Sequence, residues 1–201
     1  MKSLKSYIQE KLVIKKINNK YNYFPKTKYE LKKIIKKRIK EEGNEVDLND
    51  IDVSQIKDMS YLFDETNFNG DISNWNVSNV TDMCGMFFRC KIFNQDISSW
   101  DVSKVDNMSY MFYECTKFNQ DISKWDVSNI ENMNSMFYRC TKFNQDISKW
   151  DVSNLKEMSY MFCNCTNFNQ DISNWDVSKV KYKDRIFMYC QIKEKYKPNF
   201  K

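Results

Sequence analysis

The sequence predicts an α/β fold in which about six coils of 24–25 residues, each with one short strand and one helix, stack behind a helical N-terminal cap. Three observations predict it. Tryptophan recurs at a fixed interval of 25 residues, and the apolar residues between tryptophans change from a strand-like to a helix-like spacing. Aromatic residues make up 15% of the 201 residues, which is enough for a core. The recurring tryptophans are Trp75, Trp100, Trp125, Trp150 and Trp175.

The repeated unit reads D-I-S-x-W-D-V-S-x-(V/I/L)-x-x-M-x-x-M-F-x-x-C-x-x-F-N-Q, and an earlier, shorter copy begins at Asp47. One coil alone buries too little apolar surface to fold by itself. Its apolar side chains contribute roughly 1.5–3 kcal/mol each, against an ordering cost of about 1–2 kcal/mol for every residue. We therefore expect the coils to stack, with their strands in a parallel sheet. Full units begin at Asp71, Asp96, Asp121, Asp146 and Asp171.

Each element of the coil is assigned from spacing. Ile97, Trp100, Val102 and Val105 have the IxxLxLxxL spacing of a leucine-rich repeat, which predicts a short strand with Trp and Val pointing inward. From Val105 to Cys115 the apolar residues lie at i, i+3, i+6, i+7 and i+10, which predicts a helix. A serine stands at the expected N-cap of each helix, and Glu131 completes a capping box with one of them. These serines are Ser54, Ser78, Ser103, Ser128, Ser153 and Ser178.

The chain divides into three predicted parts: a basic helical N-terminal cap (1–43), the repeats (44–190) and a basic tail (191–201). In the cap, Thr27-x-x-Glu30 and Gly43 predict the two ends of a helix, and residues 4–17 predict another. Basic residues outnumber acidic ones by 14 to 4 in residues 1–43, whereas residues 44–178 hold 10 basic and 21 acidic residues.

The composition argues against an enzyme. There is no histidine, and the three glycines stand too far apart for a phosphate-binding loop. The seven cysteines include no CxxC motif, so we predict no metal and no cofactor. No stretch approaches the roughly 18 apolar residues of a membrane span, and the N-terminus shows no secretory signal, which predicts a cytoplasmic protein.

The candidate site is the set of residues that alternate with the inward Trp and Val and would cover a concave strand face. Neighbouring aspartates about 4.8 Å apart repel by roughly 1 kcal/mol, and binding of a protein partner with a basic surface would explain that cost. In the alternative, the aspartates accept turn or backbone hydrogen bonds, and the lysines neutralise part of their charge. The predicted site residues are Asn76, Asp101, Asp126, Asp151, Asp176, Lys124, Lys149, Ser103, Ser128 and Ser153.

Four other sets of residues are weighed in the same way. The cysteine row from Cys90 to Cys190 is interpreted as core, with Cys84 and Cys163 as the exposed thiols. The asparagine row from Asn69 to Asn169 is interpreted as a ladder that satisfies backbone groups at the corners of the coils. A second, weaker contact surface consists of Phe88, Tyr113 and Tyr138 on the outer side of the helices. The run Lys32-Lys33-x-x-Lys36-Lys37-Arg38-x-Lys40 could bind nucleic acid or anionic lipid, stay solvated, or dock on the acidic repeats.

The string FNQDISxWDVSxVxxMxxMFxxC, first met at residues 93–115, closely resembles the BspA-like leucine-rich-repeat family, including the mycoplasma-type lipoprotein repeats of unknown function. The resemblance covers about residues 47–190. It implies a right-handed, leucine-rich-repeat-like solenoid, display on the cell surface, a role in adhesion or host-protein binding, and no enzymatic activity.

We therefore expect a non-enzymatic protein-recognition module that binds its partner on the strand face. Two other functions stay open: a nucleic-acid-associated protein that uses the basic N-terminus, and a structural or assembly protein. The cell surface, implied by the resemblance, is the alternative to the cytoplasm.

Overall fold

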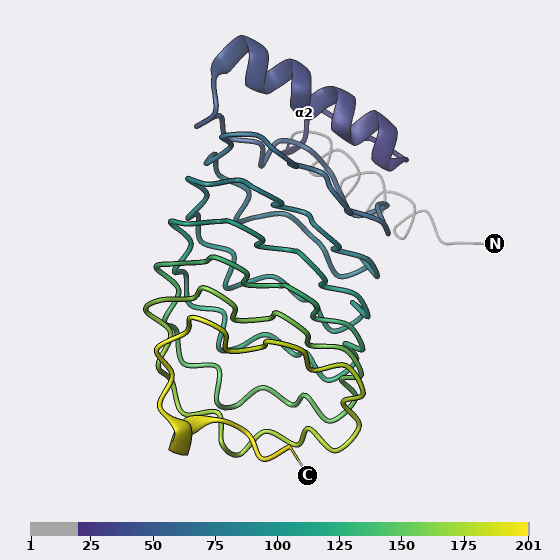
Figure 1. The fold of residues 1–201 in the computed structure, drawn as a ribbon. Helices are drawn as coiled ribbons and strands as arrows, with labels where there is room; N and C mark the ends of the chain where they lie inside the picture. The colour runs from purple at the N-terminus through teal and green to yellow at the C-terminus, as the bar shows by residue number, and fades with distance from the viewer. Residues whose placement is uncertain (1–19, 201) are drawn as a thin grey trace, which may run out of the picture.

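The computed structural model describes residues 20–200, so the helix predicted over residues 4–17 lies outside the described part. The repeats form a stack of coils, with helix α2 (Lys28–Glu42) lying across one end and the C-terminus at the other (Figure 1). The tail contains a short 3-10 helix, η1 (Glu194–Tyr196).

Helix α2 begins and ends where the sequence predicts. The Thr27 hydroxyl accepts a hydrogen bond from the N–H of Glu30, and the N–H of Gly43 donates to the Ile39 carbonyl. Gly43 has a φ of 91°, in the region that glycine adopts most readily. Leu31 and Ile35 are buried, so this face of α2 closes the core at the first coil.

The predicted α/β solenoid of strand–helix coils is wrong. Between residues 21 and 200 the chain forms no helix besides α2 and η1, and no strand or sheet. Adjacent coils share single parallel bridges, such as Asp82 with Asn107 and Asn107 with Asn132. The bridges lie after the predicted strands, at the beginning of the predicted helices. The coils therefore consist of turns, and there is no concave strand face.

Successive turns explain the spacing that suggested strand and helix. The N–H of Trp100 donates to Ile97 O at 3.2 Å and that of Val105 to Val102 O at 2.9 Å, as in β-turns. Further along the coil, Cys115 N–H donates to Phe112 O at 2.9 Å. Each turn returns an apolar side chain to the interior after three residues, which imitates the period of an amphipathic helix.

A helix is also excluded because alternate N–H groups along the predicted helix bond to the next coil. The N–H of Met108 donates to Asn132 O at 2.9 Å, and that of Phe112 donates to Met136 O at 3.0 Å. Tyr110, which lies between these donors, and Glu114, which follows them, each have a φ of 58°, in the left-handed region. Interactions between coils thus determine a backbone conformation that local sequence preference does not favour.

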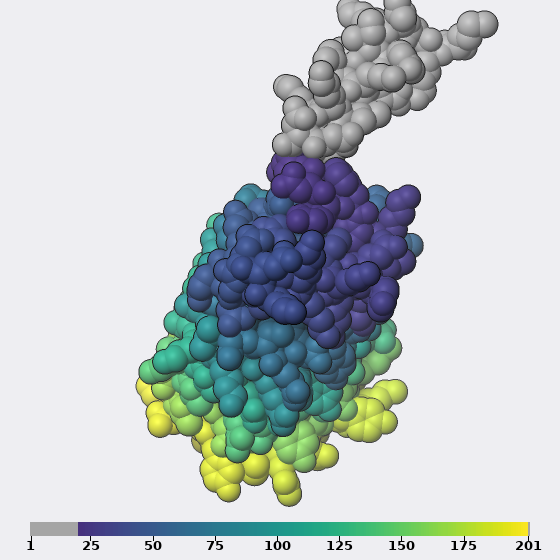
Figure 2. Space-filling model, turned by 90° about the horizontal axis from the view of Figure 1, so that it is seen from above, coloured from purple at the N-terminus to yellow at the C-terminus, as the bar shows by residue number. Residues whose placement is uncertain are grey.

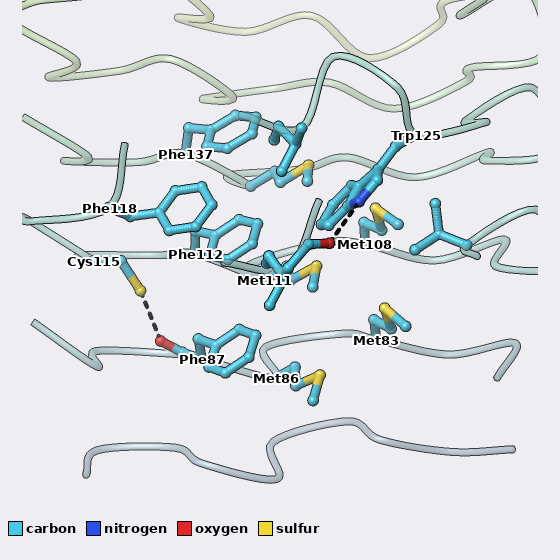
Figure 3. Close-up of a cluster of buried hydrophobic side chains, with 14 of the residues drawn as sticks. Met83, Met86, Phe87, Met108, Met111, Phe112, Cys115, Phe118, Trp125 and Phe137 are labelled. Atoms are coloured by element: carbon cyan, nitrogen blue, oxygen red, sulfur yellow. Dashed lines mark hydrogen bonds between the residues drawn. The ribbon is translucent and has the colours of Figure 1, made fainter. Parts of the chain in front are cut away.

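The core is a set of side-chain ladders that run through the stack (Figure 3). The ring of Phe112 stacks on those of Phe87 and Phe137, with ring centroids 5.6 and 5.7 Å apart. The indole N–H of Trp125 donates to the Ile97 carbonyl of the preceding coil at 3.2 Å. All five tryptophans make this bond and are 4% exposed, which confirms that they point inward.

Candidate functional site

Each of the first five coils contains three triplets in which a side-chain oxygen accepts a hydrogen bond from the N–H group two residues further on, and the last coil contains two. In one coil, the oxygens of Asp96 and Asp101 accept from the N–H groups of the serines two residues later, at 2.9 and 3.1 Å. Asn107 accepts from Ser109 N–H at 3.1 Å. These are Asx turns, which explain why D-x-S and N-x-S recur along the sequence.

The predicted site aspartates occupy the middle triplet of each coil and form the second Asp row. Their side chains are exposed, and Oδ1 of each accepts from the N–H of the following serine at 3.0–3.1 Å. The hydroxyls of Ser103 and Ser128 also donate to this oxygen, at 2.6 Å. The serines are therefore part of the turns and do not cap helices, so the predicted N-caps and the capping box of Glu131 are wrong. The row comprises Asn76, Asp101, Asp126, Asp151 and Asp176.

The turn hydrogen bonds favour the ionised form of Asp101 and Asp151. Hydrogen bonds from Ser103 lower the pKa of Asp101, and those from Ser153 lower the pKa of Asp151. The negative charge of Asp176 acts in the opposite direction on Asp151, which places both carboxylates within electrostatic reach of each other. The row thus presents fixed negative charges, and only one oxygen of each carboxylate is used by the turn bond.

Lys124 and Lys149 lie beside a parallel set of aspartates, the first Asp row. Lys149 lines a depression of about 180 Å³ between two coils, together with Asp121, Ser123, Gln145 and Asp146. The positive charge of Lys124 contributes to the lowered pKa of Asp121, after the hydrogen bonds from Ser123. The lysines thus offset part of the charge of the first row. The first Asp row comprises Asp71, Asp96, Asp121, Asp146 and Asp171.

The predicted asparagine ladder is confirmed. Asn119 Oδ1 accepts from the N–H of Asn144 at 2.9 Å, and the same bond recurs along the row from Asn69 to Asn169. A neighbouring glutamine ladder, which the sequence interpretation missed, donates from its Nε2 groups to asparagine carbonyls at 2.7–2.9 Å. Its signal was the Gln that follows each Asn in the repeat.

The cysteine row is core through most of the stack. The Cys115 thiol donates to the Phe87 carbonyl at 3.0 Å, and burial raises the pKa of Cys90 to about 12. Cys84 is half-buried, as an accessible thiol would be, but Cys163 is fully buried, so its predicted exposure is wrong. The prediction failed because it placed Cys163 on the outer side of a helix that does not form.

Phe88, Tyr113 and Tyr138 form a row on turns, not on helices as predicted. Their rings stack on one another, with centroids 4.8 and 4.6 Å apart, and all three are half-buried. Alongside runs an ion-pair ladder in which Glu114 contacts Arg89 at 3.5 Å and Arg139 at 2.9 Å. The ladder extends to Glu65 of the preceding coil. These side chains mainly contact each other. The spacing of 25 residues between Arg89, Glu114 and Arg139 was the sequence signal that could have predicted the ion-pair ladder.

Part of the basic run of α2 docks on the acidic repeats. Lys32 pairs with Asp64 at 2.6 Å, and Arg38 pairs with Asp50 at 2.9 Å. Lys28, just before the run, pairs with Asp58 at 3.1 Å. In the view from above, the purple and blue residues at this end cover the coils beneath them (Figure 2). Lys33, Lys36, Lys37 and Lys40 are exposed.

Among residues 20–200, no three Cys, Asp or Glu side chains are grouped so that they could hold a metal ion. No helix in the described part of the chain is long and apolar enough to cross a membrane.

A family model described as Mycoplasma protein of unknown function, DUF285, matches residues 30–131 and 120–197. The chain belongs to this family. The match confirms the resemblance to mycoplasma-type repeats of unknown function, but it does not confirm the BspA-like assignment, and the observed turns contradict a leucine-rich-repeat fold. No curated protein and no solved structure matches the chain.

The matched regions of this Mycoplasma family include α2 from residue 30 onwards and all the coils with the Asp rows. The family description assigns no function, so the chemistry of the surface is the basis for a proposal. The division into parts 1–43, 44–190 and 191–201 stays a prediction.

Proposed function

We propose that the protein is a non-enzymatic recognition module whose second Asp row binds a protein partner with a basic surface. The observation that supports this most is the exposed, hydrogen-bonded carboxylate at the same position of four successive coils: Asp101, Asp126, Asp151 and Asp176.

Such a row is suited to recognition because its geometry is fixed before binding. Each carboxylate is held by its own turn, so little side-chain entropy is lost when lysine or arginine side chains of a partner approach. Charges of the same sign at a regular interval also attract an oppositely charged surface and set its register. The buried side-chain ladders fix the position of each coil relative to the next, so the spacing of the carboxylates is fixed as well.

The experiment removes the negative charge of the row and retains the hydrogen bonds that form the turns. In the triple variant Asp101→Asn, Asp126→Asn and Asp151→Asn, the side-chain oxygen can still accept the serine N–H, as Asn76 does at 3.2 Å. A control variant, Glu41→Gln, Asp106→Asn and Glu131→Gln, removes the same number of exposed charges elsewhere. Both are compared with wild type in capture from nuclease-treated lysate, followed by affinity measurement with the purified partner.

The proposal expects affinity to fall about tenfold or more in the row variant and to weaken with salt, with the control variant unchanged. Equal affinity of wild type and row variant would show that the second Asp row is not the binding site. Capture only from lysate that still contains nucleic acid would replace the proposal with the nucleic-acid alternative.

A further inference from the structure

Within residues 20–200, the last coil has an edge whose backbone N–H groups have no partner. In the interior, alternate N–H groups of one coil donate to carbonyls of the next, as Tyr110 does to Asn134 O at 2.8 Å and Glu114 does to Tyr138 O at 2.7 Å. In the last coil, the equivalent N–H groups have no hydrogen-bond partner among residues 20–200. These donors belong to Lys183, Arg185, Phe187 and Tyr189, which we call the terminal edge.

Hydrogen bonds from the preceding coil hold the terminal edge in place. The preceding coil donates to its carbonyls, for instance from Tyr160 N–H to Asp184 O at 2.8 Å and from Phe162 N–H to Ile186 O at 3.0 Å. The N–H groups are therefore held in the spacing that an additional segment would need. Tyr182 and Tyr189 are 60% and 72% exposed, so the edge is accessible.

The C-terminal tail pairs with the last coil at a different place. Lys193 N–H donates to Asn169 Oδ1 at 3.0 Å, and Ile172 N–H donates to Tyr196 O at 3.0 Å. Near the terminal edge, the tail makes side-chain contacts: the Lys183 ammonium lies 5.1 Å from the centroid of the Phe200 ring, and the Lys197 ammonium lies 5.6 Å from that of Phe187. No backbone group of residues 191–200 accepts from the N–H groups of the edge.

The charge around the terminal edge is positive. Residues 179–200 contain seven basic residues, including Lys181 and Arg185, and only two acidic ones, Asp184 and Glu194. An extended segment that adds to this edge must supply carbonyl oxygens for the N–H groups, and acidic side chains would match the surrounding charge.

A second copy of this chain fits poorly. Two terminal edges placed against each other would face N–H with N–H and positive charge with positive charge. The opposite end of the stack, which would present carbonyls, lies under α2, whose Lys28 and Lys32 pair with Asp58 and Asp64 of the first coil at 3.1 and 2.6 Å. Lysines on an exposed edge also oppose pairing between like edges.

We propose that the terminal edge binds an extended acidic segment of a partner protein, which adds to the stack by accepting the N–H groups of Lys183, Arg185, Phe187 and Tyr189. This surface and its ligand are distinct from the second Asp row and its basic partner. Because the paired segments inside the stack adopt a positive φ at two positions four residues apart, glycine or asparagine in the added segment favours binding.

The test uses the full chain and a fluorescent peptide of about twelve residues that alternates Glu and Gly, long enough to span the edge. A peptide that alternates Gln and Gly is the uncharged control. Amide hydrogen exchange is followed at the four edge residues, and Met108, Tyr110, Phe112 and Glu114 serve as interior references. Affinity is compared among wild type, a Lys181→Glu, Arg185→Glu variant and a control Lys124→Glu, Lys149→Glu variant.

The Glu-Gly peptide is expected to slow exchange at the four edge amides about tenfold or more, to near the rate of the interior references. The edge variant should bind the Glu-Gly peptide about tenfold more weakly than wild type does. The control variant should bind it with the affinity of wild type. Three outcomes would overturn the proposal: no binding, binding without protection of these amides, or equal binding by the edge variant. Protection that depends on protein concentration alone, with dimers in sedimentation, would assign the edge to a second copy instead.

Discussion

Truncation of an interior ring tests whether the stack is held by its ladders. Phe112 is fully buried, and its ring stacks on Phe118 at 3.9 Å and on Phe87 and Phe137 at 5.6 and 5.7 Å. Trp125 stacks on it at 6.4 Å. Replacing a buried Phe with Ala costs about 3–5 kcal/mol, and each aromatic pair adds roughly 0.5–1.5 kcal/mol beyond area burial. Because four pairs are lost, we expect Phe112→Ala to lower the free energy of unfolding by about 5 kcal/mol.

The matched change at the end of the ladder is smaller. Phe187 is half-buried and, among the residues that the structure describes, stacks on Phe162 alone, at 5.8 Å, with the Lys197 ammonium 5.6 Å from its ring centroid. Its neighbours can also relax into solvent. We expect Phe187→Ala to cost about 2 kcal/mol, below the range for a fully buried Phe because its ring is only half-buried.

Urea unfolding followed by tryptophan fluorescence measures both values, because the tryptophans belong to the same ladders. The transition slope must agree between fluorescence and circular dichroism for the two-state treatment to hold. If Phe187→Ala costs as much as Phe112→Ala, or if Phe112→Ala costs less than about 1.5 kcal/mol, the inference that ring stacking between coils stabilises the fold is wrong.

Three further predictions concern the turns and the thiols. Asp121→Ala should lower the free energy of unfolding by about 1 kcal/mol, whereas Asp121→Asn keeps the acceptor and should change it little; equal losses in urea titration would refute the Asx-turn assignment. The folded pKa values of Asp101, Asp121 and Asp151 lie below the ordinary value, so their stabilisation is present above about pH 4 and is lost as pH falls towards the folded pKa values. The urea concentration at the midpoint of unfolding should therefore decrease when the pH is lowered below about 4. The decrease should be smaller in a variant with alanine at these positions. A thiol reagent at about pH 8 should label the half-buried Cys84 and Cys190 rapidly, but Cys115 and Cys163 only after unfolding, and the double change Cys84→Ser, Cys190→Ser should remove the rapid phase.

The repeat and the interior could be predicted from sequence, but the secondary structure could not. Trp100, Val105 and Phe112 are buried as their periodicity indicated. The same periodicity misled because a turn that closes after three residues places apolar side chains at nearly the interval of a helix. The two cases differ in the acceptors of the backbone N–H groups, and in the coils alternate N–H groups bond to carbonyls 24 positions away. Local propensity carries no information on that pairing.

The site was predictable in position but not in detail. The regular spacing of Asp101, Asp126 and Asp151 identified an exposed row, and the triplet D-x-S was already visible as an Asx-turn signal. The alternative that these aspartates accept turn hydrogen bonds is confirmed, whereas the interpretation of the serines as helix caps is wrong. Cys163 was misplaced for the same reason, since its orientation was judged from a helix that the left-handed residues of the coil prevent.

The hydrogen bonds that join residues 25 positions apart make interior coils interchangeable. Each coil offers its neighbours the same indole donor, thiol donor and asparagine acceptor, as Trp125, Cys115 and Asn119 do. Deleting or duplicating one whole 25-residue unit therefore leaves these ladder bonds with equivalent partners at each junction. Chains of this construction can vary in length by whole units, and the outward side chains of each unit can diverge while the interior is maintained.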